Sequence, residues 1–66
     1  MKNSLKVERA KLNITQDDLA REINVSRQTI NSIETGKYVP STVLALKISK
    51  YFNTALEHIF SLETTD

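Results

Sequence analysis

A three-residue break between two short segments with apolar periodicity constrains this chain more than any other feature. Asn24-Val25-Ser26 separates a predicted helix over residues 16–23 from another over residues 27–35. Asn24 tolerates a positive φ, Val25 can turn its side chain inward, and Ser26 can cap the helix that follows. We therefore expect the two helices to cross steeply instead of lying antiparallel.

Helical periodicity continues on both sides of this break and predicts an all-α chain. The predicted helices cover residues 4–12, 16–23, 27–35, 42–52 and 55–60. Thr15 with Asp18 has the spacing of a capping box, and Gly36 suits the left-handed end of a helix. The apolar residues at helical spacing form the predicted core: Leu5, Leu12, Ile14, Leu19, Ala20, Ile23, Ile30, Ile33, Leu44, Ala45, Ile48 and Phe52.

Composition excludes several classes of function. The 66 residues contain no cysteine, and His58 is the single histidine, so we expect no disulfide, no metal site and no cofactor. With no paired histidines and no glycine-rich phosphate loop, we expect no enzyme, and a chain this short leaves little volume for a small-molecule ligand. The longest aliphatic run, residues 43–46, is too short to span a membrane, and no export signal precedes it. We therefore expect a cytoplasmic protein.

Charge is distributed unevenly along the chain although the net charge is only +1. Residues 1–53 carry nine basic and five acidic groups, a balance of +4, whereas residues 54–66 carry three acidic groups and no basic one. One interpretation is that one end of the molecule faces a polyanion while the other avoids it. The other is that the imbalance arises by chance in so short a chain.

The outer face of the helix predicted over residues 27–35 is unusual. Arg27, Gln28, Asn31 and Ser32 fall on one side of it. Exposed helix faces are normally rich in Glu and Lys, which favour helix more than Asn and Ser do. These side chains match base edges in the major groove of DNA, where Arg pairs with guanine and Gln or Asn pairs with adenine. The residues alone leave two interpretations open, a reading face and an ordinary polar surface.

Candidate phosphate contacts flank this face. The first turn of the helix over 16–23 has free N–H groups that can meet a phosphate. The candidate side chains are Gln16, Thr29, Lys37, Lys6 and Arg9. For the charged residues among them, the alternative is a solvated charge with no partner.

At this point the sequence resembles a known family. The segments that carry the resemblance are Thr15–Ala20, Val25–Ile30, Ile33–Ser41, Leu44–Ile48 and Leu56–Phe60. They are similar to the Cro/C1-type (Xre family) helix-turn-helix regulators, in the minimal branch where residues 1–66 would form one lambda repressor-like DNA-binding domain. The resemblance implies a compact five-helix bundle and a homodimer that binds double-stranded DNA at a palindromic operator, most often as a repressor.

The resemblance also assigns roles to residues at matching positions. It implies that the helix over 27–35 lies in the major groove and presents its base-reading residues there. It implies that Gln16 binds phosphate and supports Gln28, that Lys37 and neighbouring backbone amides hold further phosphates, and that Arg9 and Glu34 form a structural ion pair.

This chain departs from the family pattern at four positions. Asn24 and Asn53 stand where the family has glycine, Glu8 where it has a small or apolar residue, and Thr42 where it often has leucine. Asparagine tolerates the same backbone region as glycine, so we expect the two turns to survive. Glu8 leaves the packing of the first helix open.

The resemblance places the dimer interface at the end of the chain. The candidate interface residues are Leu56, Phe60, Tyr51 and Leu62. Alternatively, Leu56, Ile59 and Phe60 complete the core of the monomer, which is the interpretation we favour for Ile59. In related short chains the two ends pair as an antiparallel ribbon, which here would join residues 2–4 to residues 61–63.

Two functions compete. The first is sequence-specific DNA binding, with repression. The second is a protein-interaction module, such as an antitoxin built on the same scaffold, in which the acidic segment 54–66 serves the partner. DNA binding that survives alanine at Arg27 and Gln28 would favour the second.

Overall fold

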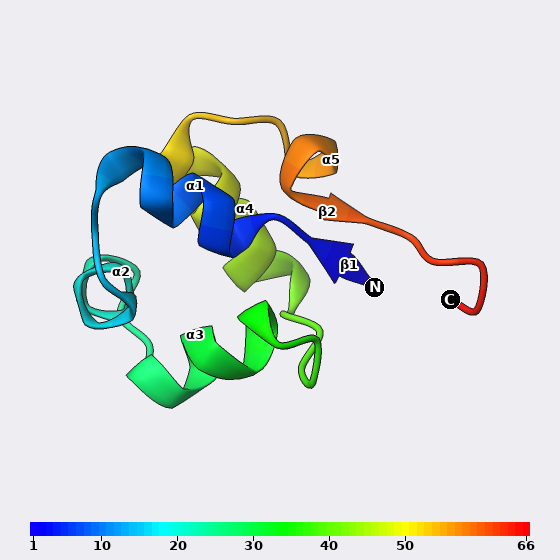
Figure 1. Cartoon of the computed structure of the whole chain (residues 1–66), viewed down its shortest axis with the longest axis horizontal. Helices are drawn as coiled ribbons and strands as arrows, with labels where there is room; N and C mark the ends of the chain where they lie inside the picture. Colours follow the sequence, from blue (N-terminus) through cyan, green and yellow to red (C-terminus); the bar gives the residue numbers. More distant parts are fainter.

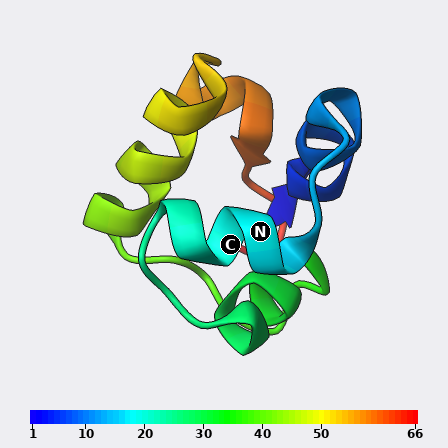
Figure 2. The same cartoon turned by 90° about the vertical axis from the view of Figure 1, so that its left-hand side faces the viewer.

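The computed structural model describes all residues from 1 to 66 as five helices and a short two-stranded ribbon (Figure 1). In chain order the elements are β1 (Lys2–Asn3), α1 (Leu5–Leu12), α2 (Gln16–Glu22), α3 (Arg27–Glu34), α4 (Thr42–Phe52), α5 (Leu56–Ile59) and β2 (Phe60–Ser61). In Figure 1 α2 is seen end-on while α3 runs across the view, and Figure 2 shows the reverse, so the two helices cross steeply as predicted. The molecule measures 32 × 22 × 20 Å.

Side-chain caps explain where three of the helices begin. Thr15 Oγ1 accepts a hydrogen bond from the backbone N–H of Asp18 at 3.0 Å, and the Asp18 carboxylate accepts one from the Thr15 N–H at 2.9 Å. This is the predicted capping box, and it satisfies N–H groups that a helix end would otherwise leave unpaired. Ser26 and Ser41 cap α3 and α4 in the same way through their hydroxyl oxygens.

Residues in the left-handed backbone conformation follow four of the helices and turn the chain. Asn13, Asn24 and Asn53 have φ angles of 55°, 60° and 52°, and Gly36 has a φ of 78°. Asparagine adopts this region more readily than most residues, which is why the two asparagines that replace family glycines leave the turns intact. The predicted limits of the first four helices agree with the structure to within one residue. The fifth is shorter than predicted because Phe60 is extended and belongs to β2.

The core lies between all five helices and contains 11 buried hydrophobic residues. They are Leu5, Leu19, Ala20, Ile23, Ile30, Ile33, Leu44, Ala45, Ile48, Ile59 and Phe60. The prediction that Leu12 shares the buried face of Leu5 is wrong, because Leu12 is the last residue of α1 and remains 51% exposed.

Glu8 takes the inward position on α1 that the sequence left open, and it is only 8% exposed. Its carboxylate accepts a hydrogen bond from Lys11 Nζ at 3.2 Å, one turn further along the same helix. A buried carboxylate is costly unless it is paired. The lysine therefore explains how α1 tolerates a charge where the resemblance implied a small or apolar side chain.

The two ends of the chain form an antiparallel ribbon, as predicted. Lys2 pairs with Ser61 and Asn3 with Phe60, so the second strand begins one residue earlier than residues 61–63. Asn3 also contacts α3, because its Nδ2 donates to the carbonyl oxygen of Ile33 at 2.8 Å. The ribbon is thereby fastened to the end of α3.

The predicted interface residues differ widely in exposure. Leu62 is 78% exposed, Leu56 and Tyr51 are half-buried, and Phe60 is only 8% exposed. Phe60 therefore packs into the core of the single chain and offers little surface to a partner, while the predicted interface itself stays a prediction. Ile59, 2% exposed, lies in the core as favoured from the sequence. None of the helices is long and apolar enough to cross a membrane.

Candidate nucleic-acid interface

The two faces of α3 have opposite character. Ile30 and Ile33 are fully buried beneath the helix. On the outer side, Arg27, Gln28 and Asn31 are exposed and Ser32 is half-buried. The four predicted base-reading residues therefore share one accessible side of a helix whose inner side is locked into the core.

A shallow hollow beside α3 adds a residue that the sequence did not single out. Ser26, Gln28, Thr29, Ser32 and Tyr38 line it. The side chain of Tyr38 is 44% exposed and comes from the loop after α3. Nothing in the pattern of a Lys-Tyr-Val-Pro loop indicates which way a tyrosine points, and only the folded loop brings it beside Gln28. Thr29 is half-buried, and its hydroxyl lies 2.8 Å from that of Ser26 at the start of α3.

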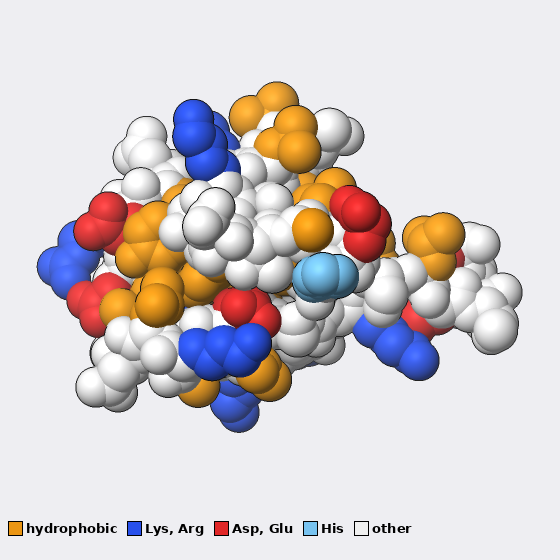
Figure 3. Space-filling model, turned by 90° about the horizontal axis from the view of Figure 1, so that it is seen from above, with side chains coloured by type: hydrophobic (Ala, Val, Ile, Leu, Met, Phe, Trp, Pro, Cys, Tyr) orange, Lys and Arg blue, Asp and Glu red, His pale blue; other side chains and the backbone are white.

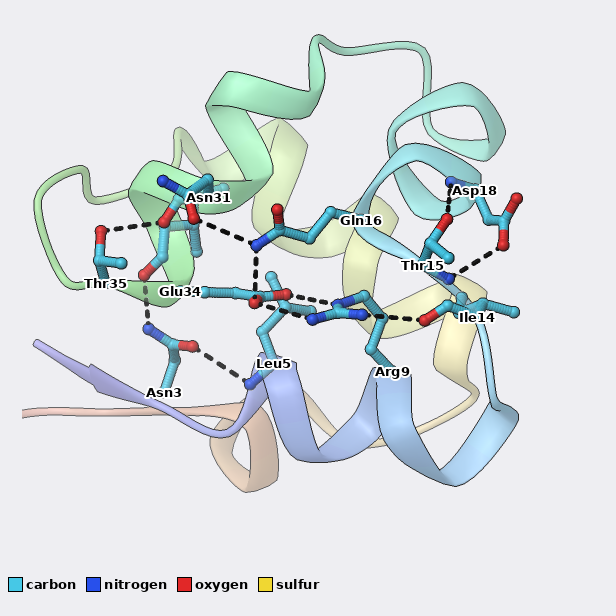
Figure 4. Close-up of polar contacts among 11 residues, drawn as sticks. Asn3, Leu5, Arg9, Ile14, Thr15, Gln16, Asp18, Asn31, Glu34 and Thr35 are labelled. Carbon is cyan, nitrogen blue, oxygen red and sulfur yellow. Dashed lines mark hydrogen bonds and ion pairs between the residues drawn. The ribbon is translucent and has the colours of Figure 1, made fainter.

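Glu34 is the centre of a polar network that joins three helices (Figure 4). Its carboxylate, only 5% exposed, accepts a bond from Arg9 Nε at 2.7 Å and another from Arg9 Nη2 at 3.1 Å. This bidentate pair is the ion pair that the family resemblance implied. Arg9 Nη1 also donates to the carbonyl oxygen of Ile14 at 2.9 Å. The network fixes α1 and the turn after it against the far end of α3.

The Arg9 side chain is therefore turned toward Glu34 and Ile14. All three of its side-chain nitrogens have partners within the chain, and the side chain is 15% exposed. The hydrogen bond to Glu34 raises the pKa of the Arg9 guanidinium above its usual value. The three hydrogen bonds of Arg9 use three of the five N–H groups of the guanidinium. The other predicted role of Arg9, a contact with the DNA backbone, stays a prediction.

Gln16 has different partners from those the resemblance implied. Its Nε2 donates to Glu34 Oε1 at 3.1 Å and to Asn31 Oδ1 at 3.2 Å. Gln16 therefore supports Asn31 and not Gln28, because Asn31 lies opposite the first turn of α2. An amide nitrogen has two N–H groups, and both are used here. Only the side-chain oxygen has no partner within the chain, and the contact of Gln16 with a phosphate stays a prediction.

The turn after α3 also uses groups that were expected to face DNA. The backbone N–H groups of Lys37 and Tyr38 both donate to the carbonyl oxygen of Ser32, at 2.9 and 3.2 Å, and the Gly36 N–H donates to Ile33 at 3.0 Å. These amides close the helix end and are not free to hold phosphates. The side chain of Lys37 remains exposed, as does that of Lys6 on α1.

The acidic end of the chain lies away from the start of α3. Figure 1 places α5 and α3 at opposite ends of the molecule, and Figure 2 agrees. Figure 3 looks onto the top of the molecule in Figure 1, opposite α3, and shows acidic and basic side chains interspersed on that face. The predicted base-reading residues and α5, which carries the acidic Glu57, therefore lie on different sides of the molecule.

A capped helix, a three-residue turn and a second helix with an exposed polar face define a helix-turn-helix DNA-binding domain. The helix-turn-helix family model matches residues 5–59. Over 63 residues, 96% of both chains, the protein is 57% identical to an HTH-type transcriptional regulator of Methanocaldococcus jannaschii. Over the same coverage it is 48% identical to the HTH-type transcriptional regulator YgzD of Bacillus subtilis. A regulator of Archaeoglobus fulgidus is 48% identical over 60 residues, 91% of this chain and 84% of that one. The chain belongs to the Cro/C1-type helix-turn-helix family.

Proposed function

We propose that this protein is a transcriptional regulator that reads double-stranded DNA with α3 in the major groove. The observation that carries the proposal is the division of α3 between a fully buried inner face at Ile30 and Ile33 and an accessible polar outer face. A helix held this firmly can present side chains to base edges at a fixed depth. The names of its relatives as transcriptional regulators support the same function.

The chemistry of the outer face favours sequence-specific readout. Arg27 can donate two bonds to guanine, and Gln28 can exchange a pair of bonds with adenine. Arg27 and Gln28 stand in the first turn of α3, the part of a recognition helix that reaches deepest into the groove. Lys37 and Lys6 are exposed cations that can contact phosphates on either side, which positions the helix without reading sequence.

We further propose that the protein acts as a homodimer on a palindromic operator, and as a repressor. Leu62, 78% exposed, with the half-buried Leu56 and Tyr51, supplies apolar surface for a two-fold contact. Two copies of α3 would then occupy half-sites about 10 base pairs apart. A dimer bound in this way excludes other proteins from the site it covers, which is the simplest route to repression by a single domain.

A selection from random duplex DNA at moderate salt tests the proposal. The wild type should enrich a palindrome with half-sites about 10 base pairs apart, and the Arg27→Ala/Gln28→Ala variant should not. Lys50→Ala removes the same single positive charge from α4 and should enrich the wild-type site. Enrichment of one site by all three proteins would contradict the role of α3. If none of the proteins enriches a site, the proposal fails, and the result favours a helix-turn-helix that binds a protein partner.

A further inference from the structure

We infer that Gln16 is a positioning residue that decides which base Asn31 can read. The inference deepens the proposed function and rests on it. Gln16, the first residue of α2, donates hydrogen bonds to two residues of α3, Glu34 and Asn31. The chemistry of these groups determines which way each amide faces, and thereby which atoms Asn31 offers to DNA.

The direction of each hydrogen bond follows from Glu34. Arg9, which is always protonated, holds this carboxylate in a bidentate pair, and an ionised carboxylate can only accept hydrogen bonds. The amide atom of Gln16 that lies 3.1 Å from it must therefore be the nitrogen. The same nitrogen lies 3.2 Å from the Asn31 side chain, so the Asn31 atom that faces it must be the oxygen.

Asn31 is left with its nitrogen as the outward group. Figure 4 shows the Asn31 nitrogen pointing away from Gln16 while the oxygen faces it. Asn31 is exposed, and no acceptor within the chain takes its two N–H groups. The side chain is thus prepared as a hydrogen-bond donor.

A donor in this position discriminates between the purines. Guanine offers two acceptors in the major groove, N7 and O6, whereas adenine offers N7 beside a donating amino group. The pair of bonds between Asn and adenine needs the amide oxygen that Gln16 already holds. At the base that Asn31 reads, we expect a preference for guanine over adenine of about tenfold, because the complex with adenine has roughly one hydrogen bond fewer. This differs from the adenine pairing that asparagine alone would predict.

The test compares base preference at one operator position between variants, using the same random duplex selection. Asn31→Ala should flatten the preference at one base pair in each half-site, which identifies the position. The wild type should select guanine there. Gln16→Met keeps the length of the side chain and removes its amide, so it should raise the tolerance of adenine at that position by about tenfold and leave the others unchanged.

Two controls keep the result specific. Gln28→Ala should flatten a different position and leave the guanine at the Asn31 position in place. Gln16→Asn has an amide too short to reach both Glu34 and Asn31, and it should repeat the shift even if the methionine variant melts early in circular dichroism.

Adenine at the Asn31 position of the wild-type site would overturn the inference, as would an unchanged preference in both Gln16 variants. An equal loss at every position would assign Gln16 to general support or to the DNA backbone and would also overturn it. If the wild type enriches no site, the proposed function itself fails and the inference falls with it. A failure confined to the Gln16 variants leaves the proposed function standing.

Discussion

Removing the carboxylate of Glu34 tests how strongly the polar network holds α3. Glu34→Ala deletes an acceptor that is 5% exposed and that takes two bonds from Arg9 and one from Gln16. Arg9 then keeps only its bond to the Ile14 carbonyl, and its charge has no counterion. Because Arg9 is 15% exposed, water can reach part of the guanidinium and reduce the loss.

The expected cost lies between two limits. An ion pair in full solvent is worth about 0–1 kcal/mol. Removing one partner of a fully buried pair costs about 3–5 kcal/mol. Partial exposure of Arg9 places this pair between them, so Glu34→Ala should lower the free energy of unfolding by about 2–3 kcal/mol. In a domain of this size that corresponds to a fall in Tm of roughly 10–20 °C.

Urea unfolding followed by circular dichroism measures this loss. Glu22→Ala is the matched control, because Glu22 is exposed and forms no ion pair in the structure, and its effect should stay within about 0.5 kcal/mol. The double variant with Arg9→Ala should lose less than the sum of the single losses, because either change alone leaves the other charge unpaired. Equal losses for Glu34→Ala and Glu22→Ala, or full additivity with Arg9→Ala, would refute the reasoning.

Three further perturbations separate binding, local capping and assembly. Lys37→Ala should weaken binding to every duplex alike and lower the slope of log affinity against log salt by about one unit; an unchanged slope excludes a phosphate contact. Hydrogen bonds from Thr15 lower the pKa of Asp18 below its usual range. The Asp18 carboxylate therefore stabilises the fold at pH values above about 3.9, its pKa in the unfolded chain, and this stabilisation is lost as pH falls through its pKa in the folded protein. The stability difference between wild type and Asp18→Ala, from thermal melts, should therefore shrink between neutral pH and pH 3, and a constant difference contradicts the capping box. Phe60→Ala should cost about 3–5 kcal/mol of stability as a core residue, whereas Leu62→Glu should leave stability unchanged and shift sedimentation toward the monomer; an unchanged sedimentation mass removes Leu62 from the interface.

The helix limits could be predicted because they depend on neighbours in the sequence. Thr15 and Asp18 are three residues apart, and Asn24 with Ser26 both ends one helix and starts the next. Each of these contacts forms within a single turn, so its energy is almost independent of the rest of the fold. The exposed side of α3 could be predicted for the same reason. Ile30 and Ile33 lie three residues apart and share the buried side of the helix, so the polar residues between and before them lie on the outer side.

The end of the chain could not be assigned from its pattern. Leu56, Ile59 and Phe60 have a spacing that suits a helix, a core and an interface equally. In the structure Phe60 leaves the helix and pairs with Asn3 as a strand. That choice depends on where the first residues of the chain lie, which no local rule contains.

Local pattern thus decides the helices, the turn between α2 and α3 and the polar residues of α3 that face outward. The folded arrangement alone decides which polar groups meet. Gln16 and Asn31 are 15 residues apart, and Arg9 and Glu34 are 25 apart, so both contacts depend on the relative placement of whole helices. A shift of one helical turn would give Gln16 a different partner on α3. The proposed reading residues can therefore be found in the local sequence, whereas the atoms they would offer to DNA follow from the hydrogen bonds between the packed helices.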